Sequence, residues 1–312
     1  MTTHVKHAIV VGIDGSSASA AALDWAVAEA VRRRRPLHLF SAGERLMPGG
    51  EAALYDAELV ERIADEAIAK AEAVLDAAVA RVALGAPGLE VTRECSLRPP
   101  AAVLVEHSTH ANTVVVGHRG HGVLVGALLG SIAHQVAAHA SCPVVVVRAP
   151  EEHTEPTGGV VVGVDGSEGS EAAVRFAFEE ASSRGCDLHV VKAWWTSTAG
   201  FSKSLKADFQ QAERLAVAET LAGWGEKYPD VTVHVTVPMA ATVSAVVRAS
   251  AEAELLVVGT RGRGGFRRLV LGSVSHGVLQ HATCPVAVVP VAGTDAATNA
   301  ATDTATDAAG RE

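Results

Sequence analysis

The sequence predicts an α/β protein made of two tandem flavodoxin-like (Rossmann-like) domains. Three observations predict this fold: a long internal repeat, short Val-rich runs, and Ala-rich segments of helical spacing between those runs. Continuous apolar runs are typical of strands buried on both faces, and strands that alternate with helices form a parallel sheet with helices on both faces. We expect five strands in each domain, in the order 3-2-1-4-5, with right-handed crossovers.

The repeat sets the domain boundaries. VVGIDGS at 10–16 recurs as VVGVDGS at 161–167, and the segment 117–131 recurs at 259–273. CPVVVV and CPVAVV follow each second motif. The period is too long for a solenoid and indicates a duplicated domain. We predict domains at residues 1–150 and 159–292, a linker between them, and a disordered Ala-, Thr- and Asp-rich tail at 293–312.

The expected elements follow in order within the first copy. The apolar run at 8–13 ends in Asp14-Gly15-Ser16 and predicts a strand, and the helical spacing after it ends before Pro36. By the same criteria we expect strands at 8–13, 37–40, 89–95, 113–116 and 144–147, and helices at 17–35, 51–84, 101–110 and 132–140. If the strand order is as expected, strands one and four flank the switch point where ligands bind in such folds.

Composition and charge exclude several classes of protein. Apolar residues make up 48% of the chain and the formal net charge is −9, which suits a globular protein and disfavours nucleic-acid binding. The basic run Arg32–Arg35 is interpreted as compensation of a helix dipole. None of the four cysteines forms a C-x-x-C pair, and Cys142 and Cys284 are expected to be buried. We expect no membrane partner and a cytoplasmic location.

A glycine loop follows the fourth strand of each copy. GHRGHGVLVGALLGS at 117–131 and GTRGRGGFRRLVLGS at 259–273 both fit G-x-x-G-x9-G-S. Glycines let the backbone approach a phosphate closely, and the closing Gly-Ser precedes a helix whose amino end attracts anions. A Walker loop is excluded because the Lys is missing, and the first βα turn lacks the Rossmann glycine pattern. The loop predicts a polyphosphate site.

These motifs together resemble the universal stress protein family, in its tandem, ATP-binding, actinobacterial form. The resemblance covers residues 5–291 and depends on VGIDGS and VGVDGS, both glycine loops, and HASCPVVVV and HATCPVAVV. It implies ATP, often with Mg²⁺, pairing of domains through their fifth strands, dimers of tandem chains, and roles in stress survival, dormancy and growth control. A regulatory protein partner is expected, but its identity is open.

The resemblance also implies which residues bind ATP. In the first copy they are Gly12, Asp14, Ala42, Gly117, His118, Arg119, Gly120, His121, Gly122, Val123, Gly130, Ser131 and Ile132. In the second copy they are Gly163, Asp165, Ala193, Gly259, Thr260, Arg261, Gly262, Arg263, Gly264, Gly265, Gly272, Ser273, Val274 and Ser275. Because His121 and Val123 replace the Arg and Gly of the second loop, we expect the first site to bind more weakly.

Several residues keep alternative interpretations. Asp14 and Asp165 can be Mg²⁺ ligands, ribose acceptors or helix caps. His118 and His121 suggest a metal only weakly, since no Cys or carboxylate lies nearby in the loop. Trp194 and Trp195 are expected to be packing or lid residues.

The sequence favours a nucleotide-responsive regulator over three alternatives. These are a slow ATPase or an adenylyl- or phosphoryl-transfer enzyme on the same cradle, an FMN carrier, and a pairing module without nucleotide. Ser131 and Ser273 have His134 and His276 three residues on but no Asp partner in sequence, so no catalytic triad stands out. We therefore expect no efficient catalysis, with weak ATP hydrolysis as the limit.

Overall fold

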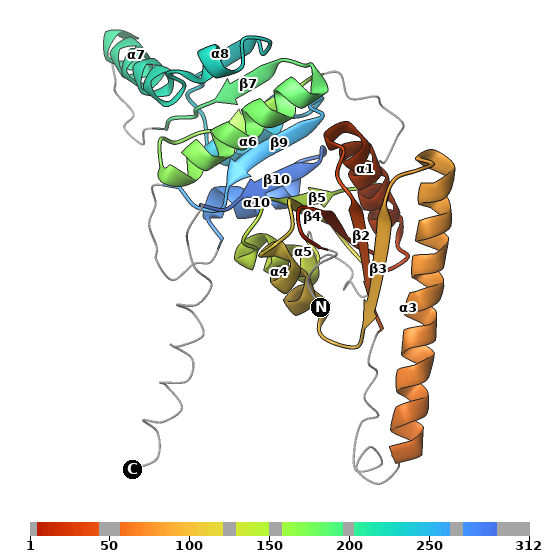
Figure 1. Ribbon diagram of the computed structural model, residues 1–312. Coiled ribbons are helices and arrows are strands. Elements are labelled where there is room, and N and C mark those ends of the chain that lie inside the picture. Colours follow the sequence, from red (N-terminus) through yellow and green to blue (C-terminus); the bar gives the residue numbers. More distant parts are fainter. Residues whose placement is uncertain are drawn as a thin grey trace, which may run out of the picture.

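The structure is a computed structural model that describes residues 5–43, 57–120, 129–149, 158–195, 203–262 and 271–291. Within these residues a single ten-stranded sheet is covered on both faces by helices (Figure 1). The first half contains β1 (Ile9–Gly12), α1 (Ser17–Arg33), β2 (Leu37–Ala42), α3 (Ala57–Gly85), β3 (Val91–Ser96), α4 (Pro100–Ser108), β4 (Thr113–Gly117), α5 (Ser131–His139) and β5 (Val144–Val147). The second half contains β6 (Val160–Gly163), α6 (Glu168–Arg184), β7 (Leu188–Val191), α7 (Lys203–Thr220), α8 (Trp224–Lys227), β8 (Val233–Thr236), α9 (Thr242–Ala249), β9 (Leu255–Gly259), α10 (Ser273–His281) and β10 (Val286–Val289).

The strand order confirms the predicted fold. The sheet runs β3-β2-β1-β4-β5-β10-β9-β6-β7-β8, which is the order 3-2-1-4-5 in each half. Every neighbouring pair within a half is parallel. The order reverses between β1 and β4 and again between β6 and β9, so each half has its own switch point.

The two halves join through their fifth strands. β5 and β10 are antiparallel, with Val146 opposite Val286 and Val144 opposite Val288. This contact within one chain confirms the pairing that the family resemblance implies. It places the halves about an approximate two-fold axis, so equivalent helices of the two copies face one another across the join.

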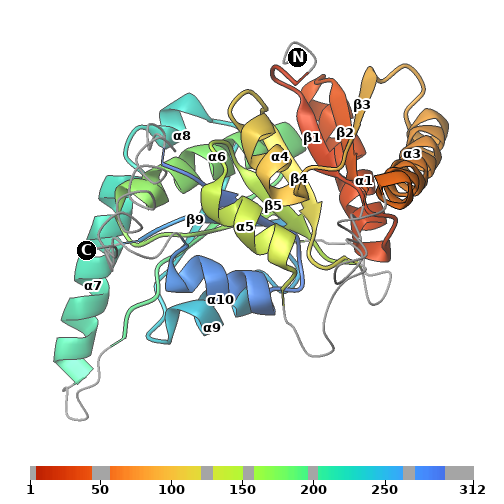
Figure 2. The same cartoon turned by 90° about the horizontal axis from the view of Figure 1, so that it is seen from below.

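Alternation along the strands divides the apolar residues between two cores. Ile9 and Val11 of β1 face one core, while Val10 between them faces the other. The first core is covered by α1, α3 and α6, and the second by α4, α5, α9 and α10 (Figure 2). Each core contains residues from both halves, so the sheet join buries a continuous interior.

The observed helices differ from the expected ones mainly at their ends. The helix expected at 51–84 is described from Ala57 to Gly85, and its expected first residues lie outside the described part of the chain. α1 ends at Arg33, because Arg34 has a left-handed backbone with φ 51°. The expected tail at 293–312 also lies outside the described residues, as does most of the linker. No described helix combines the length and apolar character needed to cross a bilayer.

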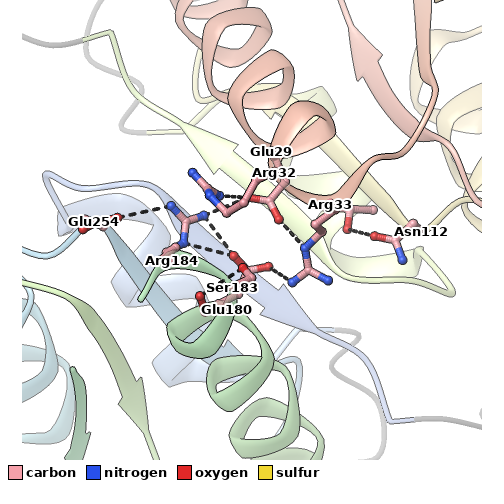
Figure 3. A network of polar contacts seen from close by, with 9 residues as sticks. Glu29, Arg32, Arg33, Asn112, Glu180, Ser183, Arg184 and Glu254 are labelled. Carbon is pink, nitrogen blue, oxygen red and sulfur yellow. Dashed lines mark hydrogen bonds and ion pairs between the residues drawn. The ribbon is translucent and has the colours of Figure 1, made fainter. Parts of the chain in front are cut away.

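The basic run Arg32–Arg35 does more than compensate a helix dipole. Arg33 forms ion pairs with Glu29 of its own helix and with Glu180 of α6. Arg184 mirrors it, at 3.0 Å from Glu29 and 2.9 Å from Glu180 (Figure 3). Glu29 and Glu180 are almost fully buried. The local interpretation was therefore incomplete, because Arg33 of this run joins Glu29, Glu180 and Arg184 in an ion network between the two copies.

Candidate nucleotide-binding site

A cavity of about 1480 Å³ opens at the carboxyl ends of β1 and β4, where the strand order of the first half reverses. The end of β2, the beginning of α4 and the first turn of α5 form part of its wall. Residues expected to bind ATP that line it are Gly12, Asp14, Ala42, Gly117, Arg119, Gly120, Gly130, Ser131 and Ile132. The fold thus brings together residues that are distant in sequence.

The turn after β1 holds Asp14 in a fixed orientation. Its Oδ1 accepts hydrogen bonds from the backbone N–H of Ser16 at 2.9 Å and from the Ser16 hydroxyl at 2.6 Å. Gly15 between them has φ 84°, a backbone that a side chain would strain. Ser16 also accepts from the N–H of Ser19 and so caps α1. Asp14 therefore supports the helix start and still lines the cavity.

The second half repeats this turn. Asp165 Oδ1 accepts from the N–H of Ser167 at 2.9 Å, Gly166 has φ 79°, and Ser167 caps α6. The caps are therefore Ser16 and Ser167, and the interpretation of the aspartates themselves as helix caps was wrong: each aspartate instead orients the capping serine.

Two glycines of each loop are needed for close packing against that turn. A Cβ on Gly120 would lie 2.2 Å from Asp14 Oδ2, and one on Gly262 would lie 2.3 Å from Asp165 Oδ2. A Cβ on Gly117 would lie 2.8 Å from the backbone of Ala18. These glycines let the loop pack closely against the Asp14 turn and its counterpart. The sequence had indicated only that the glycines allow a phosphate to approach.

The amino end of α5 faces the cavity with its amides uncapped by any described side chain. Gly130 occupies the cap position in an extended conformation, and Ser131 begins the helix with its side chain exposed. The first amides of a helix lack partners within the helix and carry the positive end of its dipole. α10 begins in the same way at Gly272 and Ser273. Each half therefore presents a helix end whose first amides are not capped by a described side chain.

Sequence reasoning missed the outer wall of the cavity. α3 contributes apolar residues, Glu66 and Lys70, and the segment before α4 contributes Arg98. The amphipathic pattern of α3 shows only that one face is covered, so its position over β2 could not be read from the sequence. Lys70, Arg98 and Arg119 give the cavity three cationic side chains.

The second half also reaches this cavity. His276 and Gln280 of α10 line it, and the rings of His134 and His276 meet edge to face at 5.3 Å. Burial, followed by the neighbouring His276 and His139, lowers the pKa of His134 below its ordinary 6.5. Both histidines therefore border the cavity at the join between the halves.

Comparison with known proteins identifies the family. The sequence model of the Universal stress protein family matches residues 6–148 and again residues 158–290. The chain belongs to the universal stress protein family. A universal stress protein of Mycolicibacterium smegmatis is 38% identical over 291 residues, covering 91% of this chain and 97% of the relative. One from Mycobacterium tuberculosis is 38% identical over 299 residues, with the same two shares.

The fold is shared with solved members of the family. A universal stress protein from Archaeoglobus fulgidus aligns with a TM-score of 0.62 at 20% identity, covering 92% of this chain and 99% of that structure. At this identity the likeness concerns the fold alone. It agrees with the tandem α/β architecture that the sequence predicts.

The remaining predicted site residues of this universal stress protein have varied positions. His118 is buried, and its backbone bonds Val147 and Gly130 rather than lining the cavity. The Ser275 hydroxyl lies 3.0 Å from the carbonyl oxygens of Thr260 and Gly272 and secures the second loop. The predicted residues His121, Gly122, Val123, Arg263, Gly264 and Gly265 lie outside the described part of the chain.

The strand end of the second site differs from that of the first. Ala193 matches Ala42, but the next residue is Trp194 where the first copy has Gly43. Trp194 stacks on Phe209 with ring centroids 6.1 Å apart, which confirms a packing role. Trp195 is 69% exposed. Gly163, Arg261 and Val274 occupy the positions that correspond to Gly12, Arg119 and Ile132 of the first half.

Proposed function

We propose that this universal stress protein binds ATP with Mg²⁺ in each half and acts as a nucleotide-responsive regulator of stress survival, dormancy and growth. The observation that carries the proposal is the convergence of Asp14, the glycine loop and the uncapped end of α5 on one cavity. Asp165, Gly262 and Gly272 repeat this arrangement and support a second site.

The residues of the cavity fit a nucleoside triphosphate. Its volume exceeds the roughly 300–1,000 Å³ of ordinary ligand pockets, so a nucleotide fits. The end of β2 at Ala42 offers backbone groups to a base, while the α5 amides, Lys70 and Arg119 suit phosphates. Asp14 would hold Mg²⁺ or the ribose. When bound, Mg²⁺ would neutralise phosphate charge.

The position of the cavity supports a regulator. A ligand there touches α5 of one half and α10 of the other, so occupancy acts directly on the contact between the halves. Family membership further supports dimers of tandem chains and a cytoplasmic location. His134 is the one feature that favours slow hydrolysis, because its lowered pKa keeps the imidazole neutral at pH 7 beside the cavity.

Mass spectrometry of small molecules released from purified protein, followed by calorimetric titration with Mg-ATP, tests the proposal. We expect bound ATP or ADP, or two titratable sites, with the first binding more weakly. Absence of both bound nucleotide and titratable binding would refute it. A turnover assay separates regulator from enzyme: sustained release of phosphate or AMP over many cycles would contradict a purely regulatory role.

A further inference from the structure

Three side chains with metal-binding chemistry meet at one edge of the first half, outside the nucleotide cavity. His38 lies on β2, Glu94 on the neighbouring β3, and His107 in the last turn of α4, which covers that face of the sheet. Both imidazoles are buried, while the side chain of Glu94 is 34% exposed. None of the three lines the nucleotide cavity.

The spacing of their ligand atoms matches a coordination site. His107 Nε2 lies 3.4 Å from Glu94 Oε2, His38 Nε2 lies 3.8 Å from the same oxygen, and all three ligand atoms are within 4.8 Å of one another. With Zn–N and Zn–O bonds of about 2.0–2.2 Å, neighbouring ligands of a tetrahedral ion are about 3.3–3.6 Å apart. Small side-chain rotations would close the remaining gap.

The surroundings orient the ligands. The hydroxyl of Thr92 lies 2.8 Å from Nδ1 of His38, which leaves Nε2 directed toward Glu94. The His107 ring meets His38 and Phe40 edge to face, at 5.2 and 5.9 Å. Nδ1 of His107 is buried and has no hydrogen-bond partner among the described residues. A cation would bind the other nitrogen of this ring, Nε2, which is the atom that faces Glu94.

We propose that His38, Glu94 and His107 bind a divalent transition-metal ion of the Zn²⁺ type. Imidazole nitrogens favour Zn²⁺ over Mg²⁺ and Ca²⁺, which prefer all-oxygen sites. Three protein ligands leave a fourth position, which faces solvent at Glu94. The ion ties the end of α4 to the β2–β3 edge, and the other ends of β2 and α4 line the nucleotide cavity.

The second half is an internal control. By strand register and repeat spacing, His189, Thr236 and Ala249 stand where the first half has His38, Glu94 and His107. Only one of the three ligand types is retained. His189 instead stacks on His234, which lies 2.9 Å from Asp187. We therefore expect one tight site per chain, in the first half.

Zn²⁺ titration of the full chain, after removal of metals by a chelator, tests the proposal. Affinity is measured by competition with a chromophoric zinc indicator, and geometry by the visible absorption of bound Co²⁺. We compare His107→Ala, which copies the second half, with Glu94→Gln at a partly exposed position and with the control His189→Ala. Thr92→Val tests the orienting bond.

We expect one tight site with a tetrahedral Co²⁺ spectrum in the wild type and in His189→Ala. His107→Ala and Glu94→Gln should each weaken binding by about 100-fold or more, and Thr92→Val by roughly 10-fold. The proposal is overturned if the wild type has no tight site, or if Glu94→Gln binds Zn²⁺ as the wild type does. Because Glu94 is partly exposed, that variant stays informative even if His107→Ala does not fold.

Discussion

At the residue scale, burial controls the chemistry of the cysteines. Burial raises the pKa of Cys142 to about 12, and it also raises the pKa of Cys284. Because the thiolate is the reactive form, both should react with a disulfide reagent at pH 8 far more slowly than Cys95 and Cys186, which are partly exposed. Mass mapping of labelled native protein measures this order, with urea-unfolded protein as control. Labelling of Cys142 as fast as Cys95 would contradict it.

His134 should give the stability a defined pH dependence. Burial, then His276 and His139, lower its folded pKa, while the unfolded chain titrates near 6.5. The contribution of neutral His134 to the free energy of unfolding is therefore complete above about pH 6.5. It is lost as the pH falls through the lower pKa of the folded state. The free energy of unfolding in urea should fall less between pH 7.5 and 5.5 in His134→Gln than in the wild type. The exposed control His110→Gln should leave the slope unchanged; an equal slope in His134→Gln would contradict the prediction.

At the element scale, the repeat offers a matched pair of helix ends. The residue that caps the end of α1 is Arg34, with φ 51°, and the equivalent cap of α6 is Gly185, with φ 65°. Only glycine adopts this backbone without cost. Arg34→Gly should raise the free energy of unfolding by about 0.5–1 kcal/mol, and Gly185→Arg should lower it by a similar amount. Denaturant unfolding measures both, and a loss of stability in Arg34→Gly would count against this account of the helix end.

The periodicity of the sequence was enough to predict the helices and strands. It was not enough to predict which of them pack against one another. The Val-rich run at β5 and the Asp14 turn are local signals, so their structures follow from neighbouring residues. Lys70 and His276 border the cavity only because α3 and α10 pack over it, and nothing local marks them. The close approach of Gly120 to Asp14 likewise depends on β1 and β4 being adjacent.

At the scale of the whole molecule, the ion network between α1 and α6 holds the two halves in a fixed position relative to each other. Arg33 was visible within the basic run of the sequence, but its partner Glu180 lies 147 residues away along the chain. The Glu-x-x-x-Arg pattern at Glu29 recurs at Glu180 and was the available signal. Burial lowers the pKa of Arg33, but the carboxylates of Glu180 and Glu29 outweigh it and the net shift is upward.

Removing one arginine should therefore be costly. Arg33→Met leaves buried Glu180 with Arg184 alone, while Glu29 keeps Arg184 and Arg32, and the loss should destabilise the chain by about 3–5 kcal/mol. Arg35→Met is the control, since Arg35 makes no ion pair with a described residue. Urea unfolding compares the two variants; equal stability would show that the network contributes nothing to the join.

The central claim is that the amino ends of α5 and α10 hold nucleotide phosphates. Glu at the first helical position of α5 favours the helix but repels phosphate, so Ser131→Glu separates binding from folding. Calorimetric titration with Mg-ATP compares it with the neutral Ser131→Gln, and Ser273→Glu tests the second site. We predict that each Glu variant weakens one site at least about tenfold, ~1.4 kcal/mol, while Ser131→Gln, which loses only the hydroxyl contact, binds more tightly than Ser131→Glu. Unchanged ATP binding in both Glu variants would contradict the account.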